Sequence, residues 1–332
     1  PAIVLFALTY VLILVFGKYR TYIALASGLV FILTGMLPVN ELLPSIDFNV
    51  ILMIIGTMGL VSLFTESKMP MLLADMVMEK VPNVKWAVVS LALFAGIISA
   101  FVDNVATVLM IAPVALAFCK KVNVSPVPAI ICIAVSSNLQ GAATLVGDTT
   151  SILLAKAANL DFSDFFVHDG RVGMFWVVQA GMLATVPVLF YIFRRETQVV
   201  DRGTVTKITN MFPTYTLLAT VACLIGASFI PEKPSITNGV ICMVFCIITV
   251  AQEFWLNRDP SKIKDTIVNI DFQTLMLLSG LFVIIQGITN VGLINDISNL
   301  FVSIAGDNVF FIYTILVWFS VIISAFSIVK SK

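Results

Sequence analysis

Long apolar runs with almost no charge recur along this chain, for example Met174–Phe193 and Ile236–Phe254. A helix of about 20 apolar residues is long enough to cross the hydrocarbon core of a membrane. Only 11% of the residues are charged and 59% are hydrophobic, whereas a soluble domain carries about 25% charged residues. Because such a chain cannot cover a surface exposed to water, we predict an all-α polytopic membrane protein.

The apolar runs between charged loops predict ordinary spanning helices. They cover Ala2–Phe16, Tyr22–Leu37, Phe48–Phe64, Met174–Phe193, Tyr215–Ile230, Ile236–Phe254 and Phe272–Ile288. The 19 basic and 19 acidic residues balance and form no basic block, so no nucleic-acid partner is expected. The five cysteines lack CxxC spacing and are predicted to be small core residues, and the lone His168 is predicted to be a loop residue.

Residues 86–118 form an apolar segment that is too short for two spans and long for one. Polar residues interrupt it near Asp103, and lysines flank it on both sides, which favours the cytoplasmic face for both ends. These features predict a re-entrant hairpin whose tip is the Ala100–Asn104 turn.

Residues 126–157 are too long for one straight span, and their middle is rich in glycine and hydroxyl residues. A continuous helix is costly there. We predict two half-helices joined by an unwound stretch, Ser136–Thr150. Unwound backbone at membrane depth is tolerated only where it is buried in protein or faces a water-filled cavity.

An internal repeat relates the two ends of the chain. The sequence IDFNVILMIIG at 46–56 matches IDFQTLMLLSG at 270–280, and IISAF occurs at both 97–101 and 322–326. Between the two matching aspartates we count an odd number of crossings, so the second copy is predicted to be inverted, as in many secondary transporters. We expect a first repeat at 1–170, a connecting span and cytoplasmic linker at 171–210, and a second repeat at 211–332.

Asp103 and Asp148 are the two acidic residues that fall deep in apolar context. A charge at the bilayer centre costs at least about 2.5–3.5 kcal/mol, so each residue is either part of an ion or proton site or a helix cap. Neutral polar groups cluster around both, although any single hydroxyl could instead bond within its own helix. The predicted substrate and ion site consists of Asp103, Asn104, Thr107, Ser137, Asn138, Gly141, Thr144, Gly147, Asp148, Thr149 and Thr150.

Hard cations prefer carboxylate, hydroxyl and carbonyl oxygens, which makes sodium the expected ion, with Asp103, Asn104 and Gly147 as predicted ligands. No other cofactor is expected. The N-termini of half-helices favour anionic groups, so a cation and an anion could bind side by side.

Two stretches carry a family resemblance: SAFVDNVAT at 99–107 and SNLQGAATLVGDTTS at 137–151. They resemble the ion transporter superfamily, and most closely its branch of arsenite permeases and pink-eyed-dilution (P) proteins. NhaD-type sodium/proton antiporters and divalent anion/sodium symporters are more distantly similar. The resemblance implies that a hairpin tip and a broken helix form half of the site, with roles for Asp103, Asn104, Thr107, Gly141, Thr144, Gly147 and Asp148.

Two departures from the family pattern limit what the resemblance implies. Thr149 and Thr150 stand where the family has a Pro-Pro pair, so substrate contacts at that turn do not carry over. The second repeat is incomplete, because its tip motif and broken helix do not follow Phe326. We expect that the sequence is truncated there; the alternative is that the second half-site comes from elsewhere.

The leading expectation is a secondary active transporter and not an enzyme. It would move a small anion or oxyanion, arsenite-like or carboxylate-like, or sodium, coupled to a sodium or proton gradient. A channel is the alternative, followed by an intramembrane enzyme with Asp103 and Asp148 as an aspartyl pair, or a structural scaffold. We expect the protein to lie in the cell (inner) membrane of a prokaryote and to contact lipid. Whether it forms a homodimer is left open.

Overall fold

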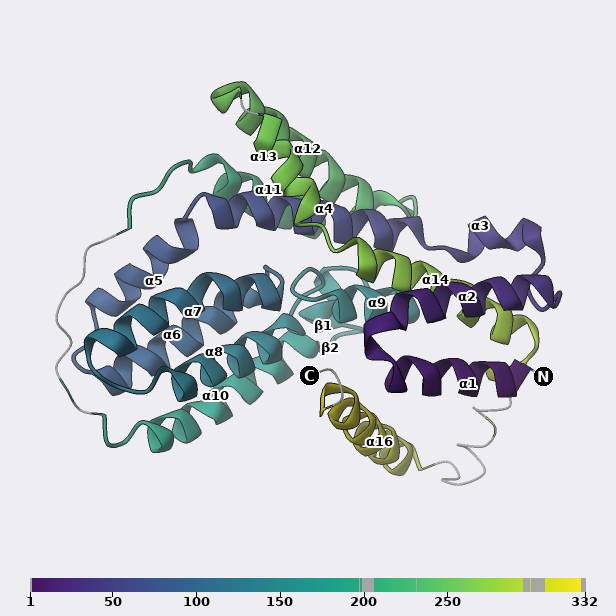
Figure 1. The fold of residues 1–332 in the computed structure, drawn as a ribbon, viewed down its shortest axis with the longest axis horizontal. Helices are drawn as coiled ribbons and strands as arrows, with labels where there is room; N and C mark the ends of the chain where they lie inside the picture. The colour runs from purple at the N-terminus through teal and green to yellow at the C-terminus, as the bar shows by residue number, and fades with distance from the viewer. Residues whose placement is uncertain are drawn as a thin grey trace. The chain divides into compact units, whose positions relative to one another are not determined.

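The computed structural model describes residues 2–196, 198, 206–230, 232–258, 260–294, 299 and 308–329. Nearly all of the regular secondary structure in the described residues is helical (Figure 1). The exception is a pair of two-residue strands, β1 (Val167–His168) and β2 (Arg171–Val172), which pair antiparallel. The prediction of an all-α polytopic membrane protein is confirmed.

The helices of the first part are α1 (Ala2–Val15), α2 (Arg20–Leu33), α3 (Leu42–Ser45), α4 (Phe48–Glu66), α5 (Met69–Glu79), α6 (Val84–Ser99), α7 (Asn104–Lys121), α8 (Pro126–Gly141) and α9 (Thr149–Ala158). Those that follow are α10 (Met174–Ile192), α11 (Phe212–Ser228), α12 (Thr237–Asn257), α13 (Pro260–Val268), α14 (Phe272–Asn290) and α16 (Val309–Val329). Short 3₁₀ turns occupy Gly17–Tyr19, Val39–Glu41 and Ser163–Phe165.

Among the described residues, five helices are long and apolar enough to cross a membrane: α4, α7, α10, α12 and α14. The first two helices differ from the two separate spanning helices predicted over Ala2–Phe16 and Tyr22–Leu37. α1 and α2 have only 14 residues each and meet at a bend of 112°. At about 1.5 Å per residue, each is shorter than the ~30 Å hydrocarbon core.

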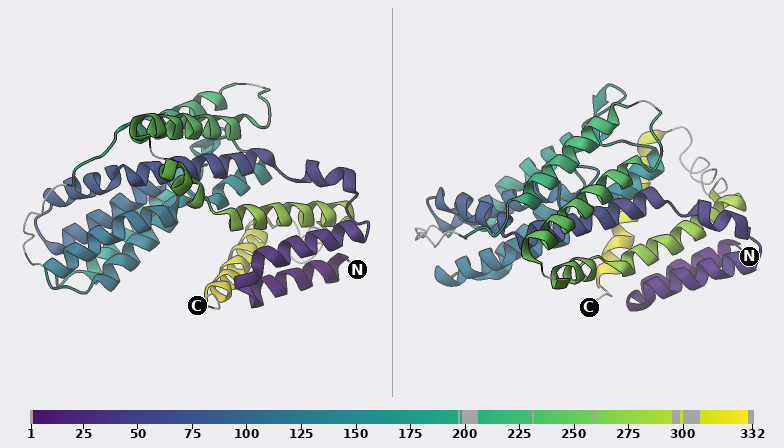
Figure 2. Two further views of the ribbon diagram at one scale, coloured as in Figure 1. Left: turned by 45° about the horizontal axis from the view of Figure 1, so that its top comes forward. Right: turned by 90° about the horizontal axis from the view of Figure 1, so that it is seen from above.

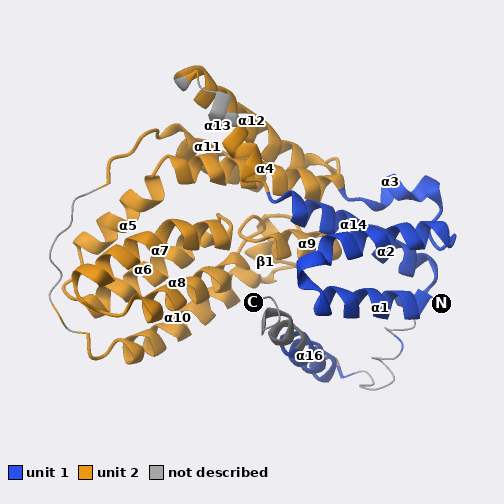
Figure 3. Cartoon of the chain, in the orientation of Figure 1, with its two compact units in different colours: residues 1–47, 271–332 blue, residues 48–270 orange. Residues whose placement is uncertain are grey.

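The chain divides into two compact units, coloured separately in Figure 3. One unit comprises residues 1–47 and 271–332, and in it α14 packs against α2 and α1. The other comprises residues 48–270. In this second unit α5, α6, α7, α8 and α10 form a bundle, and α4 packs against α12 and α11 (Figures 1 and 2). The repeat boundaries predicted from the sequence stay a prediction.

A glycine in each copy of the repeated motif lets two helix backbones approach closely. A Cβ on Gly56 of α4 would lie 2.5 Å from the carbonyl carbon of Cys242 in α12. A Cβ on the matching Gly280 of α14 would lie 2.9 Å from the carbonyl carbon of Ala24 in α2. The contact of α4 with α12 therefore has a counterpart in the contact of α14 with α2.

The same correspondence extends along both helix pairs. Asn49 Oδ1 accepts a hydrogen bond from the Gly239 backbone N–H, and the backbone carbonyl of the matching Gln273 accepts one from Thr21 Oγ1. The residues contacted in α2 and α12 are also related by a constant offset. Ala24 and Cys242 are 218 positions apart, and so are Thr21 and Gly239. Each unit thus contains one such helix pair, with one helix from each copy, which supports the repeat, while the inversion stays a prediction.

The helix break in the second unit is shorter than the sequence predicted. α8 continues through Gly141, so only residues 142–148 leave the helix, whereas the unwound stretch was predicted to begin at Ser136. The reason is tertiary contact: Ser136, Ser137 and Gln140 are buried, and Gln140 exchanges two hydrogen bonds of 2.9 Å with Gln179 of α10. Packing outweighs the poor helix propensity of this stretch.

Gly56→Ala and Gly280→Ala should each lower the midpoint of thermal unfolding of the purified protein. Each new Cβ meets backbone that cannot move aside, and overpacking of this kind costs about 1–3 kcal/mol. Gly226→Ala in α11 is the matched control, because a Cβ there has no atom within 4 Å. Unchanged midpoints in both Gly56→Ala and Gly280→Ala would show that the helix contacts are looser than described.

Candidate functional site

The hairpin of α6 and α7 turns at residues 100–103. Asp103 caps α7: its Oδ2 accepts a hydrogen bond of 3.0 Å from the Ala106 backbone N–H. The Thr107 N–H donates to the Asp103 backbone carbonyl at 2.9 Å. Asp103 therefore satisfies N–H groups that open the second arm. The structure places a turn at the predicted tip, and its re-entrant path through a membrane stays a prediction.

Asp148 plays the same part at the break between α8 and α9. Its Oδ1 accepts from the Thr150 N–H at 3.5 Å and from Thr149 Oγ1 at 3.2 Å. The Ser151 N–H donates to the Asp148 backbone carbonyl at 3.1 Å. Asp103 and Asp148 are thus both helix caps. Capping was one of the two interpretations that the sequence allowed for these residues.

Hydroxyl groups fasten the hairpin tip to the broken helix. Thr144 Oγ1 donates to the Ala100 carbonyl, and Ser137 Oγ donates to the Asn104 carbonyl at 3.1 Å. Thr107 Oγ1 donates to the Val102 carbonyl at 3.5 Å within the hairpin itself. Two of these bonds run between segments more than 30 positions apart, so the hydroxyls of Ser137 and Thr144 hold the two interruptions together.

An amide network adds a polar edge to this crossing. Asn104 Nδ2 donates to Asn138 Oδ1 at 3.0 Å and to Asp148 Oδ2 at 3.4 Å. Asn138 is exposed, and Asn104 and Asp148 are partly exposed. The network therefore couples the hairpin, α8 and the start of α9 at a place that a ligand can reach.

Two glycines lie where the segments cross. A Cβ on Gly147 would lie 2.6 Å from the Gly141 carbonyl oxygen and 2.8 Å from those of Ser99 and Ala100. A Cβ on Gly141 would meet nothing closer than 3.4 Å. Gly147 thus allows the break to touch the hairpin backbone, whereas Gly141 lies in ordinary contact.

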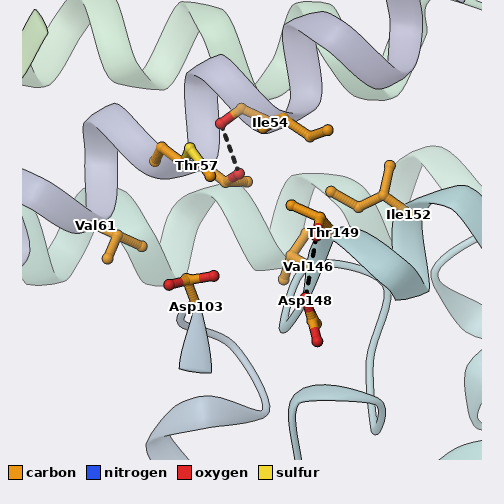
Figure 4. A pocket seen from close by; sticks show the side chains of 9 residues that line it. Ile54, Thr57, Val61, Asp103, Val146, Asp148, Thr149 and Ile152 are labelled. Atoms are coloured by element: carbon orange, nitrogen blue, oxygen red, sulfur yellow. Dashed lines mark hydrogen bonds between the residues drawn. The ribbon is translucent and has the colours of Figure 1, made fainter. Parts of the chain in front are cut away.

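A small pocket lies beside the crossing, within the second unit (Figure 4). Three predicted site residues line it: Asp103, Asp148 and Thr149. Val146 and Ile152 line it as well, and its remaining wall is α4, through Ile54, Thr57, Met58 and Val61. The other predicted residues lie around the crossing without being part of this lining.

Four helix ends meet at the site. α6 and α8 end there, and α7 and α9 begin there. Helix C-termini favour cations and N-termini favour anions. However, Asp103 and Asp148 already accept hydrogen bonds from the first N–H groups of α7 and α9. The two carboxylates therefore offset the anion preference that the sequence predicted for these N-termini, and they make the pocket more favourable to a cation.

Sequence reasoning missed several groups at the site. The α4 wall was missed, although Thr57 is a hydroxyl residue in the middle of an apolar span. Ser99 was not proposed as a site residue, yet its Oγ is buried and has no hydrogen-bond partner among the described residues. Gln179 bonds between helices, to Gln140 of α8, whereas Gln286 donates to Asn290 within α14.

The cysteines and the histidine carry no sign of a metal centre. All five cysteines are free of disulfides, and Cys119, Cys132, Cys242 and Cys246 are buried. Within the described part of the chain, no three His, Cys, Asp or Glu side chains lie together as a metal-binding group. His168 is exposed on β1, 3.4 Å from Asp164.

The apolar helices and the polar crossing between them are those of an integral membrane transporter, and comparisons with known proteins agree. The citrate transporter family, CitMHS, matches residues 10–327. The chain belongs to this family, which lies in the ion transporter superfamily, so the resemblance drawn from the two motifs is confirmed.

Individual relatives include a protein described as a transporter and two others whose printed names give no transport function. "Uncharacterized transporter Rv2684" of Mycobacterium tuberculosis is 24% identical over 326 residues, covering 93% of this chain and 72% of that protein. The "46 kDa membrane protein" of Mycobacterium leprae is 24% identical over 325 residues, covering 92% and 72%. The human "P protein" is 32% identical over 129 residues, which cover 37% of this chain and 15% of that protein.

Gly147→Ala and Gly141→Ala form a matched test of the crossing. Gly147→Ala should separate the break from the hairpin, because its Cβ would overlap three carbonyl oxygens, and transport should be lost along with a lower unfolding midpoint. Gly141→Ala should retain most of the transport activity and most of the thermal stability. Equal behaviour of the two variants, measured by uptake into proteoliposomes and by thermal unfolding, would contradict the described contacts.

Proposed function

We propose that this protein is a secondary active transporter that carries a small carboxylate, such as citrate, across the membrane together with a cation. The cation is sodium or a proton, and its gradient drives uptake by alternating access. The single observation that carries this proposal is the crossing of two interrupted helices at a pocket lined by Asp103 and Asp148. The family match supports the carboxylate, since the family is described by citrate.

Charge favours binding of the cation first. Among the described residues that line the pocket, two are acidic and none is basic. Two carboxylates at one small pocket repel each other and any anion, and a bound cation or proton removes this repulsion. The bound cation can then hold the carboxylate of the substrate, with the exposed Asn138 beside it.

Neutral backbone oxygens lie close together at the crossing. The carbonyl oxygens of Ser99, Ala100 and Gly141 all lie within 2.8 Å of the position that a Cβ on Gly147 would occupy. Hard cations prefer such oxygens. The ligands Asp103, Asn104 and Gly147 remain part of the proposal.

Exchange of cations alone is the second candidate. The acidic lining without a basic residue suits a site that moves sodium or protons and no anion. A channel and an intramembrane enzyme are further outcomes that a transport assay separates. We also propose the cell (inner) membrane of a prokaryote, in line with the mycobacterial relatives, and a homodimer as the assembly.

The test is uptake of labelled citrate into proteoliposomes under imposed sodium or proton gradients. We expect citrate to accumulate inside the proteoliposomes against its own gradient, and this accumulation should stop when the cation gradient is collapsed. Labelled arsenite and labelled sodium serve as the other substrates. Citrate-independent sodium or proton exchange would favour the second candidate, and flux that ignores both cation gradients would refute coupled transport.

Asp103→Asn and Asp148→Asn should each reduce cation-driven uptake at least tenfold, because each removes a carboxylate from the lining while keeping a capping oxygen. Asp169→Asn is the control, since that side chain is 88% exposed on the β1–β2 turn and should transport normally. Full coupling in both site variants would show that the carboxylates only cap their helices.

A further inference from the structure

Helix α4 has two faces with different partners. One face, at positions 54, 57, 58 and 61, lines the pocket, as the helical spacing of three and four residues requires. On another face, Gly56 lies against the α12 backbone and Gly59 against the Cys246 side chain. α4 is therefore a wall that α12 holds in place.

Thr57 gives the α4 wall its one hydroxyl group. The other lining residues from α4 are Ile54, Met58 and Val61. Thr57 Oγ1 donates its hydrogen to the Met53 carbonyl at 2.8 Å, with the Ile54 carbonyl at 3.2 Å. Because that hydrogen is used within the helix, the oxygen can only accept from, or coordinate, a ligand in the pocket. Figure 4 shows Thr57 across the pocket from Asp103.

The remaining side-chain oxygens of the lining are acceptors too. Thr149 Oγ1 donates to Asp148 Oδ1, and ionised Asp103 and Asp148 carry no hydrogen to donate. Four of the side chains that line this small pocket thus carry acceptor oxygens: Thr57, Asp103, Asp148 and Thr149. A proton needs only a carboxylate, whereas a metal cation gains from each further neutral oxygen.

From this arrangement we propose that Thr57 is a specificity-determining residue of the cation site and selects sodium over the proton as the coupling ion. This inference rests on the proposed cation-coupled transport. In the second repeat the matching face is Leu278, Leu281, Phe282 and Ile285, which are all apolar. The matching positions of the second copy therefore offer no side-chain oxygen.

The experiment compares Thr57→Val with Thr65→Val. Valine has the shape of threonine but lacks the oxygen. Thr65 lies on the same helix, donates to the Val61 carbonyl at 2.8 Å and is not part of the lining, so it is a matched control. Thr57→Ser keeps the oxygen and is the rescue variant.

Two readouts are measured in sodium chloride and in choline chloride: the sodium concentration for half-maximal citrate uptake, and the sodium-induced rise in the thermal midpoint of the purified protein. Thr57→Val should raise the half-maximal sodium concentration about tenfold or more, as expected for loss of one interaction with a charged group. It should also shrink the sodium-induced stabilisation. Thr65→Val and Thr57→Ser should match the unmodified protein.

The outcomes separate the inference from the proposed function. Uptake driven by protons with no sodium effect overturns the role of Thr57 and leaves coupled transport standing. Uptake that ignores both cations sinks coupled transport itself. A sodium response of Thr57→Val equal to that of Thr65→Val overturns the inference directly. If Thr57→Val does not fold, Thr57→Ala against Thr57→Ser makes the same comparison.

Discussion

Backbone that leaves the helix inside a membrane protein must find its hydrogen bonds within the protein, because lipid supplies none. Among the described residues, two interruptions of this kind meet: the turn at 100–103 and the break at 142–148. Thr144 bonds the Ala100 carbonyl, Ser137 bonds the Asn104 carbonyl, and Gly147 allows the backbones to touch. The same requirement concentrates polar groups at one point among apolar helices, and this point is the candidate site.

The wall of the site depends on a separate constraint. α4 contacts α12 through glycines, and the same kind of contact joins α14 to α2 in the other unit. Close contact between helix backbones needs small residues, which is the usual way that helices associate in lipid. Thus one glycine-based interface positions the α4 wall, while caps and hydroxyls position the hairpin and the broken helix against it.

Much of this could be predicted from the sequence. Aspartates, asparagines and glycines inside apolar runs have few acceptable places, so Asp103, Asp148 and Gly147 indicated the interruptions and their meeting. The exact extent of the break could not be predicted, because Ser137 and Gln140 stay helical through contacts with distant residues. The α4 wall was missed for a similar reason. Thr57 bonds a carbonyl of its own helix, as many helical threonines do, and only its position at the pocket opposite Asp103 sets it apart.

The central claim is that the turn, the break and α4 enclose one cation site. High-resolution structures of the purified protein in sodium chloride and in choline chloride test it most directly. We expect density in sodium chloride alone, in the pocket and within coordinating distance of oxygens from Asp103, Asp148 and Thr57. Sodium bound elsewhere, or identical empty pockets in the two salts, would contradict it.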